Sequence, residues 1–147
     1  MATILLPNDF REFLRLLNSH EVRYLLIGGY AVNYHGCPRA TGDMDVWIDN
    51  QPANAGRAAS VLREFGFAQA SAALFAEPGK VIRMGVPPLR IEVLTSISGV
   101  EFAACYDQRV VAEISGVRVN VIGMDDLKTN KRASGRLKDL ADVEELG

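Results

Sequence analysis

The sequence has little of what marks a secreted, membrane or zinc-binding protein. Among its 147 residues are only two cysteines, Cys37 and Cys105, far apart and outside any CxxC spacing. Such a pair predicts neither a disulfide framework nor a zinc site, so we expect reduced thiols in or near the core. No apolar run reaches membrane-spanning length, and the first residues lack the pattern of a signal peptide. These absences favour a cytoplasmic protein without membrane contact.

Two common catalytic motifs are absent as well. The chain has no GxxxxGK[ST] phosphate loop, which argues against the usual kinase or ATPase architecture. Ser96 and Ser98 follow a predicted strand without a GxSxG elbow, which argues against a serine hydrolase. The net charge is −2, so no general basic coat for nucleic acid exists, while a local basic patch for an RNA partner stays open.

The sequence does have enough apolar material for one core. Hydrophobic residues make up 48% of the chain and charged residues 23%, the balance of an ordinary globular domain. At this length we expect a single domain over residues 1–147, with a helical C-terminal portion from about residue 123 to 147.

The order of predicted elements mixes helices and strands. Helical spacing predicts helices at residues 8–20, 30–35, 53–65, 100–106, 124–133 and 137–146, with Asn8 or Asp9 capping the first. Strand-like runs occupy residues 23–27, 43–49, 81–86, 89–95, 109–114 and 117–122. Turn residues at 87–88 and 115–116 join the last four runs into two hairpins. Repeated hairpins argue against a fully parallel sheet, so we predict an α+β fold with a mixed sheet flanked by helices.

A glycine pair, Gly28-Gly29, stands where a buried strand turns into a short helix. Glycine permits a sharp turn and lets a ligand approach the main chain. The first amides of a helix lack partners within it, and the helix dipole favours anions. The pair therefore suits a phosphate group, and the alternative is a plain tight turn.

Two aspartates, Asp43 and Asp45, are spaced two apart in a predicted strand. Residues with this spacing point to the same face. Two neighbouring carboxylates repel each other unless a cation lies between them, and hard oxygen ligands suit magnesium. The alternative is a solvent-facing strand edge that carries two acids.

A third acid, Glu92, interrupts a run that otherwise predicts a core strand. Burial of an unpaired carboxylate is unfavourable, so Glu92 meets a cation or faces outward. If its strand lies beside that of Asp43 and Asp45, three carboxylates converge as in a two-metal phosphoryl-transfer site. The alternative is an exposed residue paired with Arg90 or Arg83.

The glycine pair, the segment RATGDMD (residues 39–45) and the later acid together resemble the DNA polymerase beta-like nucleotidyltransferase superfamily. The tail KRASGRLKDLAD (residues 131–142) is similar to the C-terminal helical motif of small bacterial relatives of toxin–antitoxin and abortive-infection nucleotidyltransferases. The resemblance runs from about residue 24 to about residue 146 and implies the minimal nucleotidyltransferase fold with C-terminal helices. It also implies that Arg39 and Thr41 brace the loop or touch phosphate.

The resemblance assigns the remaining roles residue by residue. Gly28 and Gly29 would contact the triphosphate. Asp43 and Asp45 would ligate two magnesium ions, with manganese as the alternative metal. Glu92 would ligate one ion and help to deprotonate the attacking hydroxyl.

The tail would supply the cations that neutralise the triphosphate. The resemblance assigns this to Lys131, with Arg136 or Lys138. Asp139 and Asp142, at helical spacing, would orient those cations. The alternative is a solvated helix carrying ion pairs of no functional consequence.

The implied activity is magnesium-dependent transfer of a nucleoside monophosphate from a triphosphate such as ATP to a hydroxyl of RNA, a protein or a small molecule. Two departures from the family pattern are that Glu92 replaces the more usual aspartate and that a second glycine replaces the usual serine. The Glu92 substitution and the small size of the chain motivate a second hypothesis. This alternative is a nucleotide-binding or regulatory module with weak or no turnover. A third hypothesis is a toxin–antitoxin component whose main role is pairing with a partner protein.

Overall fold

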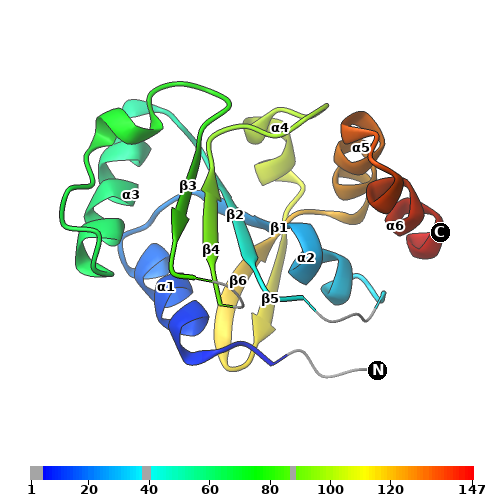
Figure 1. Ribbon diagram of the computed structural model, residues 1–147, viewed down its shortest axis with the longest axis horizontal. Coiled ribbons are helices and arrows are strands. Elements are labelled where there is room, and N and C mark those ends of the chain that lie inside the picture. Colours follow the sequence, from blue (N-terminus) through cyan, green and yellow to red (C-terminus); the bar gives the residue numbers. More distant parts are fainter. Residues whose placement is uncertain (1–4, 38–40, 87–88) are drawn as a thin grey trace.

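A computed structural model describes residues 5–37, 41–86 and 89–147. Within these residues one mixed sheet has the strand order β3-β4-β2-β1-β6-β5 (Figure 1). Its strands are β1 (Tyr24–Ile27), β2 (Met44–Ile48), β3 (Val81–Met84), β4 (Ile91–Leu94), β5 (Val110–Ile114) and β6 (Val117–Val121). The helices are α1 (Asn8–Ser19), α2 (Gly28–Tyr34), α3 (Pro52–Glu64), the short 3-10 helix η1 (Ala72–Phe75), α4 (Phe102–Asp107), α5 (Met124–Ser134) and α6 (Leu137–Leu146). The predicted α+β class is confirmed.

The pairing of the strands explains why the sheet is mixed. The hairpins β3–β4 and β5–β6 are antiparallel and form the two edges. The central strands β1 and β2 are also antiparallel, but β2 pairs with β4 in parallel and β1 pairs with β6 in parallel. The hairpin prediction at residues 115–116 is confirmed, because Ser115 and Gly116 adopt φ values of 52° and 79°, as a two-residue hairpin turn requires.

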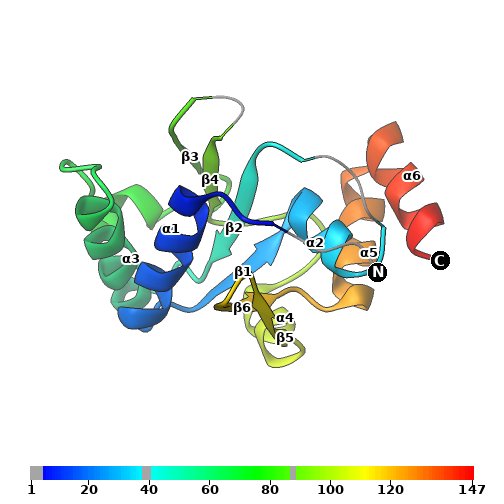
Figure 2. The ribbon, with the colours of Figure 1, turned by 90° about the horizontal axis from the view of Figure 1, so that it is seen from below.

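Helices cover both faces of the sheet (Figure 2). On one side α1 and α3 pack together, and the rings of Phe13 and Phe65 lie 5.1 Å apart. On the other side lie α2, α5 and α6 (Figure 2). Met44, Val46 and Ile48 of β2 are all buried in the core, as the alternation of that strand predicts.

Most predicted boundaries lie close to the observed ones, with two differences that affect the site. Helix α2 begins at Gly28, two residues earlier than predicted, so the glycine pair forms its first turn. Asp43 precedes β2 instead of lying within it. The predicted cap of α1 is wrong: Pro7 occupies the N-cap position, and Asn8 lies inside the helix, where its side chain accepts a hydrogen bond from Arg11.

Both cysteines are buried thiols that form no disulfide among the described residues, as predicted. Of the helices that the structure describes, none has the length and apolar character needed to cross a membrane.

A buried asparagine joins three elements of the core. Asn54, near the start of α3, is 2% exposed. Its Oδ1 accepts a hydrogen bond from the backbone N–H of Arg23 at 2.7 Å. Its Nδ2 donates to the carbonyls of Arg23 and Asp49 at 3.1 and 2.7 Å. One side chain therefore ties α3 to the start of β1 and to the end of β2.

We expect Asn54→Ala to lower the free energy of unfolding by about 2–3 kcal/mol, because it leaves buried backbone groups without partners. Urea denaturation followed by circular dichroism measures this. Asn50→Ala is the matched control, since the half-buried Asn50 makes no side-chain hydrogen bond among the described residues. The control should stay within about 0.5 kcal/mol of the wild type. Equal losses in the two variants would contradict the bridging role.

Candidate active site

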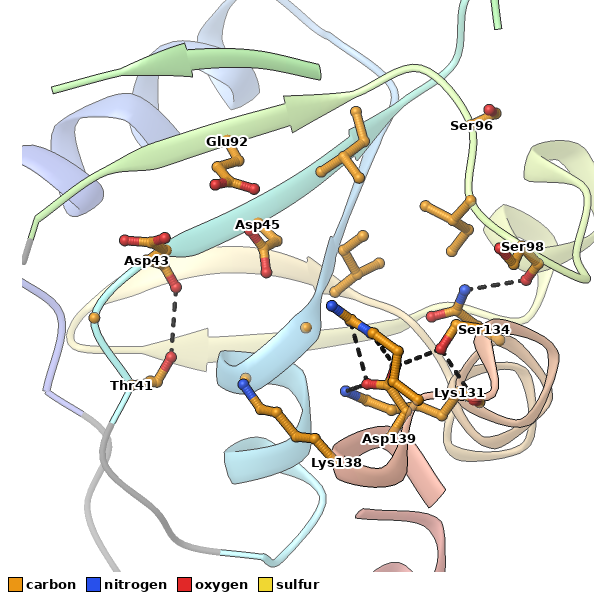
Figure 3. Close-up of a pocket in the computed structure, with 18 residues that line it drawn as sticks. Thr41, Asp43, Asp45, Glu92, Ser96, Ser98, Lys131, Ser134, Lys138 and Asp139 are labelled. Atoms are coloured by element: carbon orange, nitrogen blue, oxygen red, sulfur yellow. Dashed lines mark hydrogen bonds and ion pairs between the residues drawn. The ribbon is translucent and has the colours of Figure 1, made fainter. Parts of the chain in front are cut away.

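Three carboxylates meet on one face of the sheet (Figure 3). Asp45 in β2 lies directly opposite Glu92 in the parallel neighbour β4. Residues opposite each other on paired strands point to the same face, and so do residues two apart along a strand. Asp43 lies just before β2 and joins the same group, because it lines the same cavity and shares with Glu92 the contact to Nη2 of Arg90. The structure brings together all three residues that the sequence analysis proposed as metal ligands.

A cavity of about 720 Å³ opens beside these carboxylates. One wall comes from the end of β1 and the start of α2, and the opposite wall comes from β4 and the loop that follows it. Helices α5 and α6 close the third side. The lining residues are Ile27, Gly28, Gly29, Thr41, Gly42, Asp43, Asp45, Glu92, Leu94, Ser96, Ile97, Ser98, Asn130, Lys131, Ser134, Arg136, Lys138 and Asp139.

Gly28 is required by the position of Asp45. Its φ is +67°, and a Cβ placed on it would lie 2.2 Å from Oδ2 of Asp45. Any side chain here would both strain the backbone and displace the carboxylate. Packing against Asp45 alone therefore explains why residue 28 is a glycine, without any bound ligand. Gly29 lines the cavity beside it, and triphosphate contact by either glycine stays a prediction.

The surroundings of Asp45 change its pKa. Burial, followed by the charges of Glu92 and Asp43, raises its pKa to about 7, while Lys131 and Lys138 act in the opposite direction. When the pKa of a carboxyl group is raised in this way, a cation placed beside it stabilises the charged form. The electrostatics of the face therefore favour binding of positive charge.

Two arginines contact the other carboxylates. Nη2 of Arg90 lies 2.9 Å from Oδ2 of Asp43 and 3.3 Å from Oε1 of Glu92. Nε of Arg83 lies 3.3 Å from the same Glu92 oxygen. The hydrogen bond to Asp43 raises the pKa of Arg90. Glu92 therefore pairs with both arginines, as one interpretation predicts, but its side chain is only 18% exposed and also lines the cavity. Its role as a metal ligand stays a prediction.

The tail residues form a buried ion cluster between α5 and α6. Nζ of Lys131 lies 3.2 Å from Oδ1 of Asp139 and 3.0 Å from Oδ2 of Asp142. Nε of Arg136 donates to Oδ2 of Asp139 at 2.6 Å, and the Ser134 hydroxyl donates to the same oxygen. Burial disfavours the charged form of Asp139, but the hydrogen bonds from Arg136, Ser134 and Lys131 outweigh it and lower its pKa to about 2. The acids do hold the cations in place, and Lys131 is ion-paired within the cavity wall.

Lys138 differs from the other cations of the cavity. Its side chain extends into the cavity away from the cluster around Asp139 (Figure 3). Among the described residues it has no hydrogen bond or ion pair. It is close enough to Asp45 to lower the pKa of that carboxyl group. A free ammonium group at this position is suited to an anionic ligand.

The remaining predicted residues lie around the loop before β2. The hydroxyl of Thr41 donates a hydrogen bond to the backbone carbonyl of Asp43 at 3.4 Å, which braces the loop (Figure 3). Arg39, the other residue predicted to brace the loop or touch phosphate, lies outside the described residues.

Sequence reasoning missed the far end of the cavity. Nδ2 of Asn130 donates to the carbonyl of Ser98 at 3.0 Å, which joins α5 to the loop after β4. Ile97 lies between Ser96 and Ser98 in the same wall. Only the position of Asn130, next to Lys131 and one helical turn before Ser134, could have indicated that it faces the cavity.

The donors of this face fit a hard divalent cation. Three carboxylates offer oxygen ligands, and a cation would stabilise the charged form of Asp45, whose pKa is raised. In the part of the chain that the structure describes, however, no three His, Cys, Asp or Glu residues are spaced as a complete ligand set. Magnesium needs only one or two carboxylates when substrate phosphates complete its shell, so this spacing remains compatible with it.

Solved structures share the fold. A protein from Thermotoga maritima, provisionally classed as a nucleotidyltransferase, matches with a TM-score of 0.61 and 14% identity over 93% of this chain and 87% of that chain. An antigenic nucleotidyltransferase-like protein from Paracoccidioides brasiliensis matches with a TM-score of 0.56 and 16% identity over 96% of this chain and 77% of that one. At these identities the likeness shows the fold alone. No protein with a curated description matches the sequence.

A family model matches nearly the whole chain. The match covers residues 7–147 and therefore includes the three carboxylates, the glycine pair and the ion cluster of the tail. This agrees with the nucleotidyltransferase resemblance of the sequence. The chain belongs to the family described as nucleotidyl transferase of unknown function (DUF2204).

Proposed function

We propose that this protein transfers a nucleoside monophosphate from a nucleoside triphosphate to an acceptor hydroxyl and releases pyrophosphate. The observation that carries the proposal is the convergence of Asp43, Asp45 and Glu92 on a cavity to which α6 presents Lys138. Acids that gather metal ions and cations that meet phosphates are the two requirements of phosphoryl-transfer sites. The family supports nucleotidyl transfer as the reaction class.

Magnesium, or manganese in its place, is the proposed cofactor. Asp43, Asp45 and Glu92 would hold it, and when bound it would neutralise charge that builds up on the phosphate oxygens. Lys138 would bind the triphosphate by charge, and Gly29 leaves room for phosphate to approach the start of α2. Lys131, which stays in the ion cluster, would attract the triphosphate at a distance and would not contact it directly.

The reaction exchanges one phosphorus–oxygen bond for another. The acceptor oxygen attacks the α-phosphorus, and the bond from that phosphorus to the oxygen bridging to the β-phosphate breaks. Pyrophosphate leaves with the electron pair of that bond. The hydroxyl proton passes to a carboxylate of the site, and we assign this role to Glu92. RNA, a protein side chain and a small molecule are the alternative acceptors.

One observation favours a second candidate function. Arg90 already pairs with Asp43 and Glu92, which is compatible with a nucleotide-binding or regulatory module that performs no turnover. Pairing with a partner protein, as a toxin–antitoxin component, is a prediction from the sequence resemblance alone.

Label transfer separates the enzyme from the binding module. We expect transfer of label from at least one of α-labelled ATP, CTP, GTP and UTP to total RNA or to cell protein with magnesium or manganese. Asp45→Asn should reduce this transfer by about a thousandfold, because metal-assisted charge stabilisation is lost. Asp107→Asn, on the exposed end of α4, is the control. Tight nucleotide binding without transfer by the wild type would instead support the module.

The repulsion among the carboxylates should be visible without metal. Since folding raises the pKa of Asp45 from 3.8 to about 7, the folded state binds its proton more tightly, and stability is lost as pH rises between these values. Asp45→Asn removes this loss. In EDTA we expect its unfolding free energy to exceed that of the wild type by on the order of 2 kcal/mol at about pH 8, with the gain shrinking toward about pH 4. Asp107→Asn should show no such trend, and a gain independent of pH would contradict the shift.

Triphosphate binding should depend on Lys138. Lys138→Ala removes a free ammonium group from the cavity, and we expect the dissociation constant of the best-bound nucleotide to rise about tenfold in calorimetry. Lys128→Ala is the matched control, because Lys128 belongs to α5 but does not line the cavity. If both variants bind like the wild type, Lys138 has no part in nucleotide binding.

A further inference from the structure

Arg90 joins two of the three proposed metal ligands through a single nitrogen atom. Its Nη2 lies 2.9 Å from Oδ2 of Asp43 and 3.3 Å from Oε1 of Glu92. The side chain of Arg90 is 30% exposed, and those of Asp43 and Glu92 are 32% and 18% exposed. The guanidinium group therefore holds positive charge at a position between the carboxylates of the loop before β2 and of β4.

Arg83 offers a comparison within the same site. It contacts Glu92 alone, through Nε at 3.3 Å, and its side chain is 57% exposed. Among the described residues, Arg90 is the side chain that forms ion pairs with two of the three carboxylates. An exposed pair such as that of Arg83 contributes little, because solvent screens it. A less exposed guanidinium shared between two acids has a larger electrostatic effect.

We propose that Arg90 is an internal counter-ion that takes the place of a divalent cation in the metal-free protein and competes with it. The inference rests on the proposed metal site. The carboxylate oxygens that accept from Arg90 are among those that the site offers to a metal. Magnesium binds oxygen at about 2.1 Å, so a bound ion and this guanidinium would repel each other at close range. Binding of the metal therefore displaces Arg90 from Asp43 and Glu92.

The proposal explains two features together. Three neighbouring acids can stay on one face without metal because Arg90 neutralises part of their charge. The same contact weakens metal binding, since Arg90 must be displaced first. A metal ion that arrives with triphosphate brings additional contacts to the cavity, so the proposed site favours the metal–nucleotide complex over the metal alone.

The direction of the change in metal affinity tests the proposal. Arg90→Gln removes the competing charge, and we expect the dissociation constant of Mn²⁺, measured alone by electron paramagnetic resonance, to fall about tenfold, within the range of coupling between sites. Arg90→Lys keeps a cation at this position and should bind Mn²⁺ within about threefold of the wild type. Arg83→Gln is the matched control and should change the affinity by less than about twofold.

Weaker or unchanged Mn²⁺ binding by Arg90→Gln would overturn the proposal, because Arg90 would then brace the metal ligands or act independently of them. A measurement on the wild type covers the case in which the variant does not fold. Titration with Mg²⁺ should shift the Nε–H resonance of Arg90 and speed up rotation of its guanidinium group in NMR spectra. A resonance that does not respond while Mg²⁺ binds would overturn the proposal as well.

The outcomes separate this inference from the proposed function. If neither the wild type nor any arginine variant binds Mn²⁺, the metal site itself is wrong and both proposals fail. If the wild type binds Mn²⁺ and Asp45→Asn does not, the metal site holds. The change that Arg90→Gln causes in the dissociation constant of Mn²⁺ then decides the role of Arg90.

Discussion

The site depends on the placement of one carboxylate beside two others on one face of the mixed sheet. Asp45 faces Glu92 across the β2–β4 pairing, and strand register allows no other direction for either side chain. Burial and the neighbouring charges raise the pKa of Asp45 to about 7. Such an arrangement is unfavourable unless positive charge lies near it. The elements around the carboxylates place arginine and lysine side chains near them.

The fold meets this need with cations from two directions. Arg83 and Arg90 come from β3 and from the residue before β4, and they contact Glu92 and Asp43 directly. The lysines of α5 and α6 act on Asp45 from across the cavity without touching it. The space left between the two groups is the cavity itself. Because the arginines pair with the neighbouring acids and the lysines act on Asp45 only from a distance, Asp45 stays accessible to a ligand.

The sequence predicts those parts of the fold and the site that depend on local pattern. Apolar spacing located the helices and strands, and the spacing of Asp43 and Asp45 placed them on one face. The position of Glu92 beside them does not follow from local pattern, because the parallel pairing of β2 with β4 is a long-range contact. Arg90 was considered only as a partner of Glu92, since bridging to Asp43 depends on the same pairing. The cap of α1 was missed because Pro7 starts the helix without a side-chain bond.

The ion cluster of the tail shows why a conspicuous lysine need not touch the substrate. Lys131 lies in the cavity wall, and its charge lowers the pKa of Asp45. Asp139 and Asp142 hold its Nζ at 3.2 and 3.0 Å, so this charge acts on Asp45 from a fixed position. Because breaking a buried ion pair leaves an uncompensated charge, release of Lys131 from the cluster carries a large free-energy penalty. The acids of the tail thus fix the position of a charge that acts on Asp45, and the tail and the sheet are linked through Lys131.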